Sequence, residues 1–185
     1  MEMLTANDRN ITQGTIVDNV PWVNNDYPIL GIVISNPCDL NNHKASFITI
    51  AGLVDAGETL KNTSEFQSIV DGANEHLELK TKPWDSLKKW INSFIHNKSV
   101  CRYFFINPGE IIDADPFLVD FQNLITIPIA EKEYLVSIAQ LSTPYAQQMI
   151  VHFSSYISRI GVDRIDEDSA NLLFDELVSP YNKKK

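Results

Sequence analysis

The sequence predicts an α+β fold: a small SH3-like β-barrel, or a strongly twisted antiparallel sheet, with a helical insertion and two C-terminal helices. Two β-rich regions, residues 14–55 and 101–140, contain short runs of Val, Ile and Phe between turn-forming Asn, Asp, Pro and Gly residues. Residues 58–98 and 143–179 instead space their apolar residues as amphipathic helices do. We expect these regions to form a single domain over residues 1–185.

The first β-rich region is expected to contribute three strands. A short strand over residues 15–17 follows Gly14, and the third strand, residues 46–51, follows a polar turn. Between them, residues 28–35 are apolar at successive positions. This pattern predicts a strand that is buried on both faces and is therefore central in the sheet.

The insertion is expected to hold two helices, of which the first, residues 64–72, is short. The second begins at Pro83, because proline is favoured at the first position of a helix. Its apolar stripe consists of Trp84, Leu87, Trp90, Ile91, Phe94 and Ile95. We interpret both tryptophans as core residues, because a stripe at this spacing normally faces the interior.

The second β-rich region is expected to contribute four strands, at residues 101–106, 117–121, 124–129 and 134–139. Two helices then follow. Pro144 opens the first, which ends at Gly161. Asp166 opens the second, where the helix dipole favours an acid, and Pro180 ends it.

The composition restricts the expected partners. The chain is 44% hydrophobic with a net charge of −9, and its one basic run is the three lysines at residues 183–185. Binding to phosphates relies on clustered Lys and Arg, so nucleic acid is not the expected partner. The polar N-terminus and the lack of a run of about 18 apolar residues predict a cytoplasmic protein rather than an exported or membrane protein. We expect another protein, encoded nearby, as the partner, and self-association is left open.

A thiol, a carboxylate and an imidazole follow the expected central strand, at Cys38, Asp39 and His43. Thiolate and imidazole are zinc ligands, and Cys101 or His152 would supply a further ligand. Alternatively, Cys38 is a nucleophile with a histidine base. The preferred interpretation of Cys38 is structural, as a buried residue. For Asp39 two interpretations are equally open: it accepts backbone hydrogen bonds within its turn, or it is functional. We therefore expect no cofactor, with zinc as the alternative, and no disulfide between the two cysteines.

Two charged residues lie within apolar strands, Arg102 and Asp120. A charge that faces the core requires a partner, so we expect a salt bridge between these two residues, with a polar site as the alternative. If the protein is an enzyme, both join Cys38, Asp39 and His43 as candidate catalytic residues. His152 lies beside an apolar helical stripe, and we interpret it as a core or boundary residue. The chain has no Gly-rich phosphate loop and no Gly-x-Ser-x-Gly motif.

Five short motifs carry a resemblance to a known family. They are Cys38-Asp39-Leu40, Arg102-Tyr103-Phe104, Val119-Asp120-Phe121, Thr143-Pro144-Tyr145 and Arg159-Ile160-Gly161. The chain resembles a family of uncharacterised bacterial proteins that look like accessories of mobile or anti-phage defence loci. The motifs span most of the chain, and the resemblance implies a setting rather than an activity.

The N-terminal part is similar, more loosely, to the SH3-like barrels of MazF/CcdB-type toxins. The similar segments are residues 14–17, 28–35 and 47–50, which correspond in layout to three barrel strands. In the toxins a catalytic arginine precedes the proline of the second strand, whereas this chain has Tyr27 there. The resemblance therefore implies the barrel rather than ribonuclease activity.

Two functions from different classes follow. The first is a non-catalytic partner or regulatory protein of a bacterial defence or toxin–antitoxin module, which acts through protein–protein binding. The alternative is a nuclease-like or metal-assisted hydrolase with its site at the Cys38-Asp39-His43 corner. The two functions are distinguished by whether the candidate residues converge in one open pocket.

Overall fold

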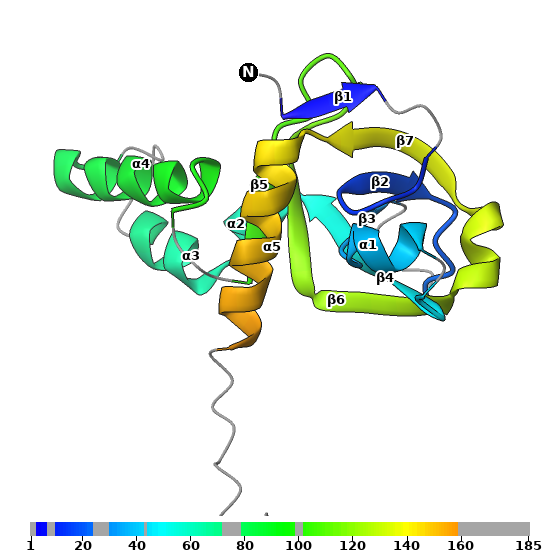
Figure 1. The fold of residues 1–185 in the computed structure, drawn as a ribbon. Coiled ribbons are helices and arrows are strands. Elements are labelled where there is room, and N and C mark those ends of the chain that lie inside the picture. Colours follow the sequence, from blue (N-terminus) through cyan, green and yellow to red (C-terminus); the bar gives the residue numbers. More distant parts are fainter. Residues whose placement is uncertain are drawn as a thin grey trace, which may run out of the picture.

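A computed structural model describes residues 3–6, 10–23, 30–42, 44–71, 79–98 and 102–158. Its strands form one seven-stranded antiparallel sheet that curls into a half-barrel (Figure 1). In spatial order the strands are β1 (Leu4–Ala6), β7 (Val136–Leu141), β2 (Thr15–Asp18), β3 (Gly31–Val33), β4 (Phe47–Asp55), β6 (Phe117–Pro128) and β5 (Tyr103–Ile106). The predicted α+β fold class is confirmed.

The sheet curls because β6 turns a corner, which Figure 1 shows as a sharp bend in the strand. Along β4, Ala51 pairs with Leu124, but the next residue, Gly52, pairs with Asp120. The residues of β6 between these two partners form a bulge, and bulges bend the strand that carries them. The sequence predicted two strands here, 117–121 and 124–129. That division was wrong, because the break between them is a bulge inside one strand.

The central strands bury side chains on both faces, as predicted. Neighbouring residues of β3 illustrate the alternation: Ile32 belongs to one core cluster and Val33 to the other. The first cluster includes Phe104 and Phe121 and is covered by α5 (Thr143–Ile157). The second includes Leu40 of the short helix α1 (Pro37–Asn41). Each face of the curled sheet thus has its own packed core.

Helix α5 begins as the sequence predicts, with Ser142 at its N-cap and Pro144 in its first turn. It buries Ala146, Met149 and His152 against the sheet. Within the described residues it ends at Ile157. The predicted stop at Gly161 and the predicted second C-terminal helix lie outside the described residues.

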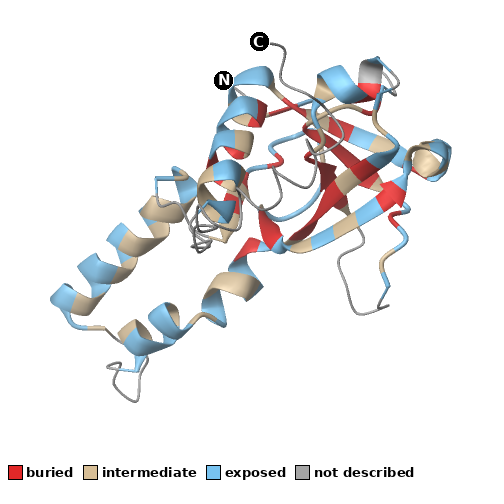
Figure 2. Ribbon diagram, turned by 60° about the horizontal axis from the view of Figure 1, so that its bottom comes forward, coloured by how far each residue is buried: buried red, intermediate tan, exposed pale blue. Residues whose placement is uncertain are grey.

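The helical insertion connects β4 to β5 and consists of α2 (Ala56–Lys61), α3 (Ser64–Val70) and α4 (Thr81–Ile95). The sequence predicted the last two, but not α2. Figure 2 shows the buried residues concentrated in the sheet and α5, whereas α3 and α4 contain none. Side-chain caps begin the first two helices: the Asp55 carboxylate accepts a hydrogen bond from Glu58 N, and Thr63 Oγ1 accepts one from Phe66 N.

Asn97 fixes the insertion to the edge of the sheet. Its side-chain amide accepts a hydrogen bond from Phe105 N at 2.6 Å and donates one to Phe105 O at 3.0 Å. The amide thus takes the place of a neighbouring strand along β5, an edge strand whose backbone groups would otherwise lack partners. Asn97 has a positive φ of 49°, a conformation that asparagine tolerates just after a helix.

Three further elements were not predicted: β1, α1 and the 3₁₀ helix η1 (Ile129–Tyr134). The last of these displaces the start of the final strand from residue 134 to Val136. The expected strand 28–35 is shorter than predicted within the described residues, over Gly31–Val33, and its first two residues are not described. None of the helices in the described segments has the length and hydrophobicity needed to cross a bilayer.

Candidate functional site

The corner that follows β3 is a helix rather than the expected turn. Asn36 is the N-cap of α1, and its Oδ1 accepts a hydrogen bond from Cys38 N at 2.8 Å. Pro37 occupies the first helical position, which its fixed φ favours. Leu40 is buried and anchors α1 in the second core cluster. The capping residue at this corner is therefore Asn36, which the sequence interpretation had not selected.

Two candidate residues of this corner, Cys38 and Asp39, are exposed. Cys38 is exposed and is a free thiol, whereas the structural interpretation placed it in the interior. Asp39 is also exposed, and its backbone carbonyl accepts hydrogen bonds from Lys44 N at 3.0 Å and Ala45 N at 3.1 Å. The hydrogen bonds at Asp39 are thus made by its main chain. His43 lies outside the described residues.

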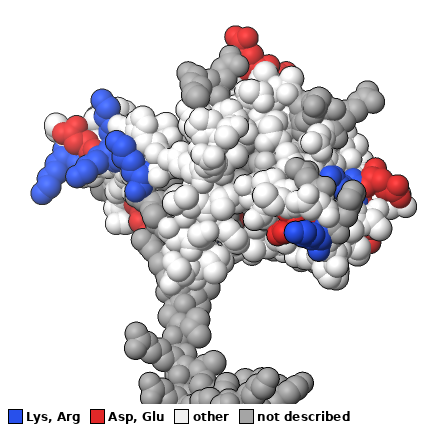
Figure 3. Space-filling view, viewed as in Figure 1, with Lys and Arg blue, Asp and Glu red and all other residues white. Residues whose placement is uncertain are grey.

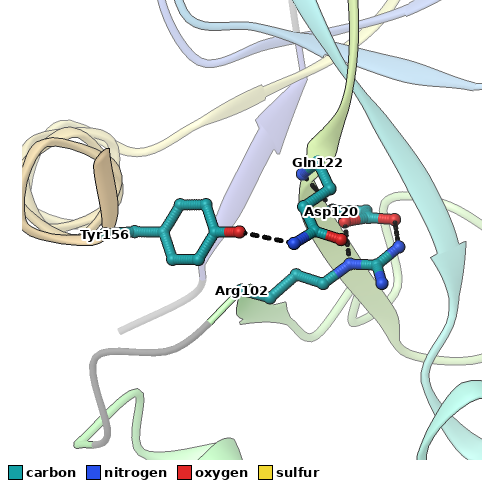
Figure 4. A network of polar contacts seen from close by, with 4 residues as sticks. All are labelled: Arg102, Asp120, Gln122 and Tyr156. Carbon is teal, nitrogen blue, oxygen red and sulfur yellow. Dashed lines mark hydrogen bonds and ion pairs between the residues drawn. The ribbon is translucent and has the colours of Figure 1, made fainter. Parts of the chain in front are cut away.

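Arg102 and Asp120 pair with each other, as expected from their apolar neighbours. Arg102 Nε donates to Asp120 Oδ1 at 2.6 Å, and Nη2 donates to Oδ2 at 2.5 Å (Figure 4). The Asp120 side chain is 6% exposed and that of Arg102 is 41% exposed, so the carboxylate is buried while the guanidinium reaches the surface. Hydrogen bonding to Asp120 raises the pKa of Arg102, which keeps the guanidinium charged.

The ion pair holds the bulge of β6 together. Asp120 Oδ1 also accepts a hydrogen bond from Gln122 N, at 3.0 Å, inside the bulge. The Arg102 carbonyl accepts one from Phe121 N at 3.1 Å, and Gln122 Nε2 donates to the Tyr156 hydroxyl of α5 at 2.8 Å. Figure 4 shows Arg102 facing the Asp120 carboxylate, and the Tyr156 hydroxyl reaching the side chain of Gln122. The network therefore satisfies backbone groups that the bulge removes from the ladder.

The described members of the two groups of candidate residues do not converge. A cavity of about 900 Å³ is lined by Arg102 and Asp120, but neither Cys38 nor Asp39 contributes to it. His152 is buried in the first core, with its ring centroid 5.7 Å from that of Phe104. Cys101 is not among the described residues. Across the segments that are described, no three His, Cys, Asp or Glu side chains are grouped so that they could hold a metal ion.

An open apolar surface lies on the insertion. An apolar cavity of about 770 Å³, the insertion cavity, separates the helices from the sheet. Its aromatic wall includes Phe66 and Trp90, whose ring centroids are 6.2 Å apart. Phe105 of the sheet edge lines it from the other side. Ile91 and Ile95 of α4 also line this cavity, and Ile91 lines a second, smaller hollow as well.

We call the exposed apolar stripe of α4, together with Lys88 beside it, the α4 surface, defined by Trp84, Leu87, Lys88, Ile91 and Ile95. Trp84 is 58% exposed and Ile95 is 42% exposed. A shallow hollow of about 300 Å³ is lined by the first four of these residues together with Asn92. The interpretation of Trp84 as a core residue was wrong. The spacing identified an apolar stripe, but only its Trp90 side packs against α3.

The α4 surface is bordered by positive charge, in a protein that is acidic overall. Residues 79–98 contain five lysines and one aspartate, a net charge of 5 − 1 = +4. Figure 3 shows these basic side chains gathered over α4. The sequence interpretation missed this region because the lysines were averaged with the five acids of residues 56–78. Counting charges within the helix alone would have found it.

No protein-family model matches the chain, and no curated protein sequence matches it either.

Proposed function

We propose that this protein is a non-catalytic partner or regulatory protein of a bacterial defence or toxin–antitoxin module in the cytoplasm. It acts by binding another protein, encoded by a neighbouring gene, through the α4 surface. The observation that carries the proposal is the exposed apolar stripe of α4, with Trp84 58% exposed at one end and Ile95 42% exposed at the other. Contiguous apolar surface of this kind marks interaction sites. The family resemblance supports the defence or toxin–antitoxin setting.

The shape of the surface favours a helical partner segment. Trp84, Leu87, Ile91 and Ile95 lie three to four residues apart, so they form one stripe that extends about 16 Å along the helix axis. A stripe of this shape fits the apolar face of a second amphipathic helix. Trp84 is suited to be the anchor, because tryptophan is enriched among residues that dominate binding energy.

The positive charge around the α4 surface favours a negatively charged partner. Lys88 borders the stripe, and the surrounding residues 79–98 carry +4. An acidic amphipathic segment would therefore be steered to α4 and held there by rim ion pairs. The hydrolase alternative lacks a comparable observation, because Cys38 and Asp39, the described candidates of the corner, are absent from the lining of the cavity that Arg102 and Asp120 line.

The proposal is tested by expressing this chain with each product of its neighbouring genes and measuring the affinity of any complex by titration calorimetry. Trp84→Ser should weaken binding at least about 30-fold, the effect of losing an anchor residue. Val151→Ser is the matched control, because Val151 is 67% exposed on α5, and it should leave the affinity unchanged.

Two outcomes would overturn the proposal. One is that no neighbouring gene product binds, or that the partner binds the Trp84→Ser variant as tightly as the wild-type protein. The other is that the α4 lysines serve a different ligand. In that case a DNA duplex or an anionic lipid vesicle would bind the isolated protein, and Lys88→Glu with Lys89→Glu would abolish this binding.

A further inference from the structure

We infer that the acidic segment 166–179 of this same chain docks on the α4 surface and competes with the partner. The inference rests on the proposed function for its regulatory meaning, because docking would mask the surface that the partner needs. It commits to one occupant, the chain's own C-terminal segment.

The first argument is the pattern of the segment. Its apolar residues are spaced for one helical face: Ala170, Leu173, Phe174, Leu177 and Val178. Asp175 and Glu176 lie beside that face. As a helix, residues 166–179 would extend about 21 Å, and the 15 residues of α4 extend about 22 Å. The two helices would thus be matched in length.

The second argument is charge. Residues 162–179 contain one arginine and six acids, a net charge of 1 − 6 = −5. Residues 79–98 carry five lysines and one aspartate, 5 − 1 = +4. These are oppositely charged segments of one chain, and each has an apolar face. Complementary charges at the rim set the orientation and partner choice of paired helices.

The third argument is reach. The end of α5 is fixed near the start of β5, because the Tyr156 hydroxyl bonds to Gln122 at 2.8 Å within the Arg102–Asp120 network. At the other end of the path, Asn97 follows α4 directly and bonds to Phe105 of β5 at 2.6 and 3.0 Å. The seven residues 159–165 can extend by up to about 23–25 Å. Both ends of the path are thus tied to β5, and a connection of this length favours docking within the same molecule.

Docking of this kind would reduce the apparent affinity for the partner. A protein whose binding surface is covered nine-tenths of the time binds about tenfold more weakly than the uncovered form. The partner would have to displace the segment, and its local concentration near α4 is high because both belong to one chain. The C-terminal segment would thus set the threshold for complex formation.

The test uses the full-length protein with a nitroxide label on Asn171→Cys in a Cys38→Ser, Cys101→Ser background. In ¹⁵N-labelled protein, the label should broaden the amide signals of α4, including Lys88 and Ile91. The matched control carries the same label together with Phe174→Asp and Leu177→Asp, which remove the apolar face, and broadening should be lost. Lys88→Glu should reduce the broadening, and adding Glu176→Lys should restore it.

Two results would overturn the inference: equal broadening of α4 with and without Phe174→Asp and Leu177→Asp, or no broadening at all. A second experiment mixes labelled ¹⁴N protein with unlabelled ¹⁵N protein. Broadening in this mixture would mean that a second copy, rather than the same chain, supplies the segment, and this too would overturn it.

The experiment contains no partner, so its failure leaves partner binding at the α4 surface untouched. Conversely, docking could be observed while partner affinity proves insensitive to Trp84→Ser; the proposed function would then fail and the inference would stand. When both hold, Phe174→Asp with Leu177→Asp should tighten partner binding about tenfold.

Discussion

The sheet and the helical insertion contain similar apolar side chains but bury them very differently. Phe104 and Ile50 of the sheet are completely buried, and Phe121 nearly so. In the insertion, α3 and α4 have no buried residue, and Trp84 is more than half exposed. The sheet residues are covered by other strands and by α5, whereas the apolar face of α4 is only partly covered by α3. The same amphipathic pattern thus contributes stability in one region and offers a binding surface in the other.

The largest expected effect is the loss of a core aromatic ring from the sheet. Phe121 packs against His152, Phe153 and Tyr156, with ring centroids 5.2 to 6.2 Å apart. Phe121→Ala should reduce the free energy of unfolding by about 3–5 kcal/mol, because it leaves a cavity in a fully packed core. Trp90→Ala in the insertion should cost only about 1–2 kcal/mol, because Trp90 is half-buried. Urea denaturation measures both values, and equal costs would contradict the comparison.

The next effect concerns the corner of β6. Asp120→Ala should cost about 2–3 kcal/mol, because it removes the acceptor for Gln122 N and leaves Arg102 without its partner. The cost stays below that of a fully buried ion pair because the Arg102 side chain is 41% exposed. Asp120→Asn keeps an acceptor for the bulge and should cost less. If both variants unfold at the same urea concentration as the wild-type protein, the network does not hold the bulge.

These residues show what the sequence could and could not predict. Both charges lie among apolar neighbours, so a mutual salt bridge was predictable without coordinates. The bulge was not, because it depends on the register between β6 and β4, which are more than 60 residues apart in the chain. Similarly, the apolar stripe of α4 was predictable from spacing alone. Which half of that stripe is covered depends on where α3 and the sheet edge lie.

The third-largest expected effect concerns Asn97, which joins the insertion to the edge of the sheet. Asn97→Ala removes two hydrogen bonds to Phe105 and places a non-glycine, non-asparagine residue at a φ of 49°. We expect a loss of about 1–2 kcal/mol. Asn97→Gly relieves the backbone strain and isolates the hydrogen-bond contribution.

Hydrogen exchange is the sharper measurement for this variant. The amide of Phe105 should exchange faster in Asn97→Ala, whereas the amides of Ile50 and Val119 in the sheet should be accelerated only as far as the global loss of stability requires. Opening of the insertion alone would show that it is a separate cooperative unit. If all amides change together, the insertion and the sheet unfold as one unit. The two regions would then differ in the exposure of their apolar side chains but not in their stability.

The smallest expected effect is at Cys38, which belongs to the sheet region yet is exposed like the α4 surface. The exposure of a side chain, rather than the region that contains it, should determine how much stability its removal costs. Cys38→Ala should therefore change the free energy of unfolding by less than about 0.5 kcal/mol. Asn36→Ala, two residues earlier, should cost about 1 kcal/mol because it removes the cap of α1.

Melting temperatures and the activity of the module should be measured on the same variants. A Cys38→Ala protein with unchanged stability and no activity would identify the corner as functional and favour the enzyme alternative. A protein with both properties retained would leave α4 as the functional surface.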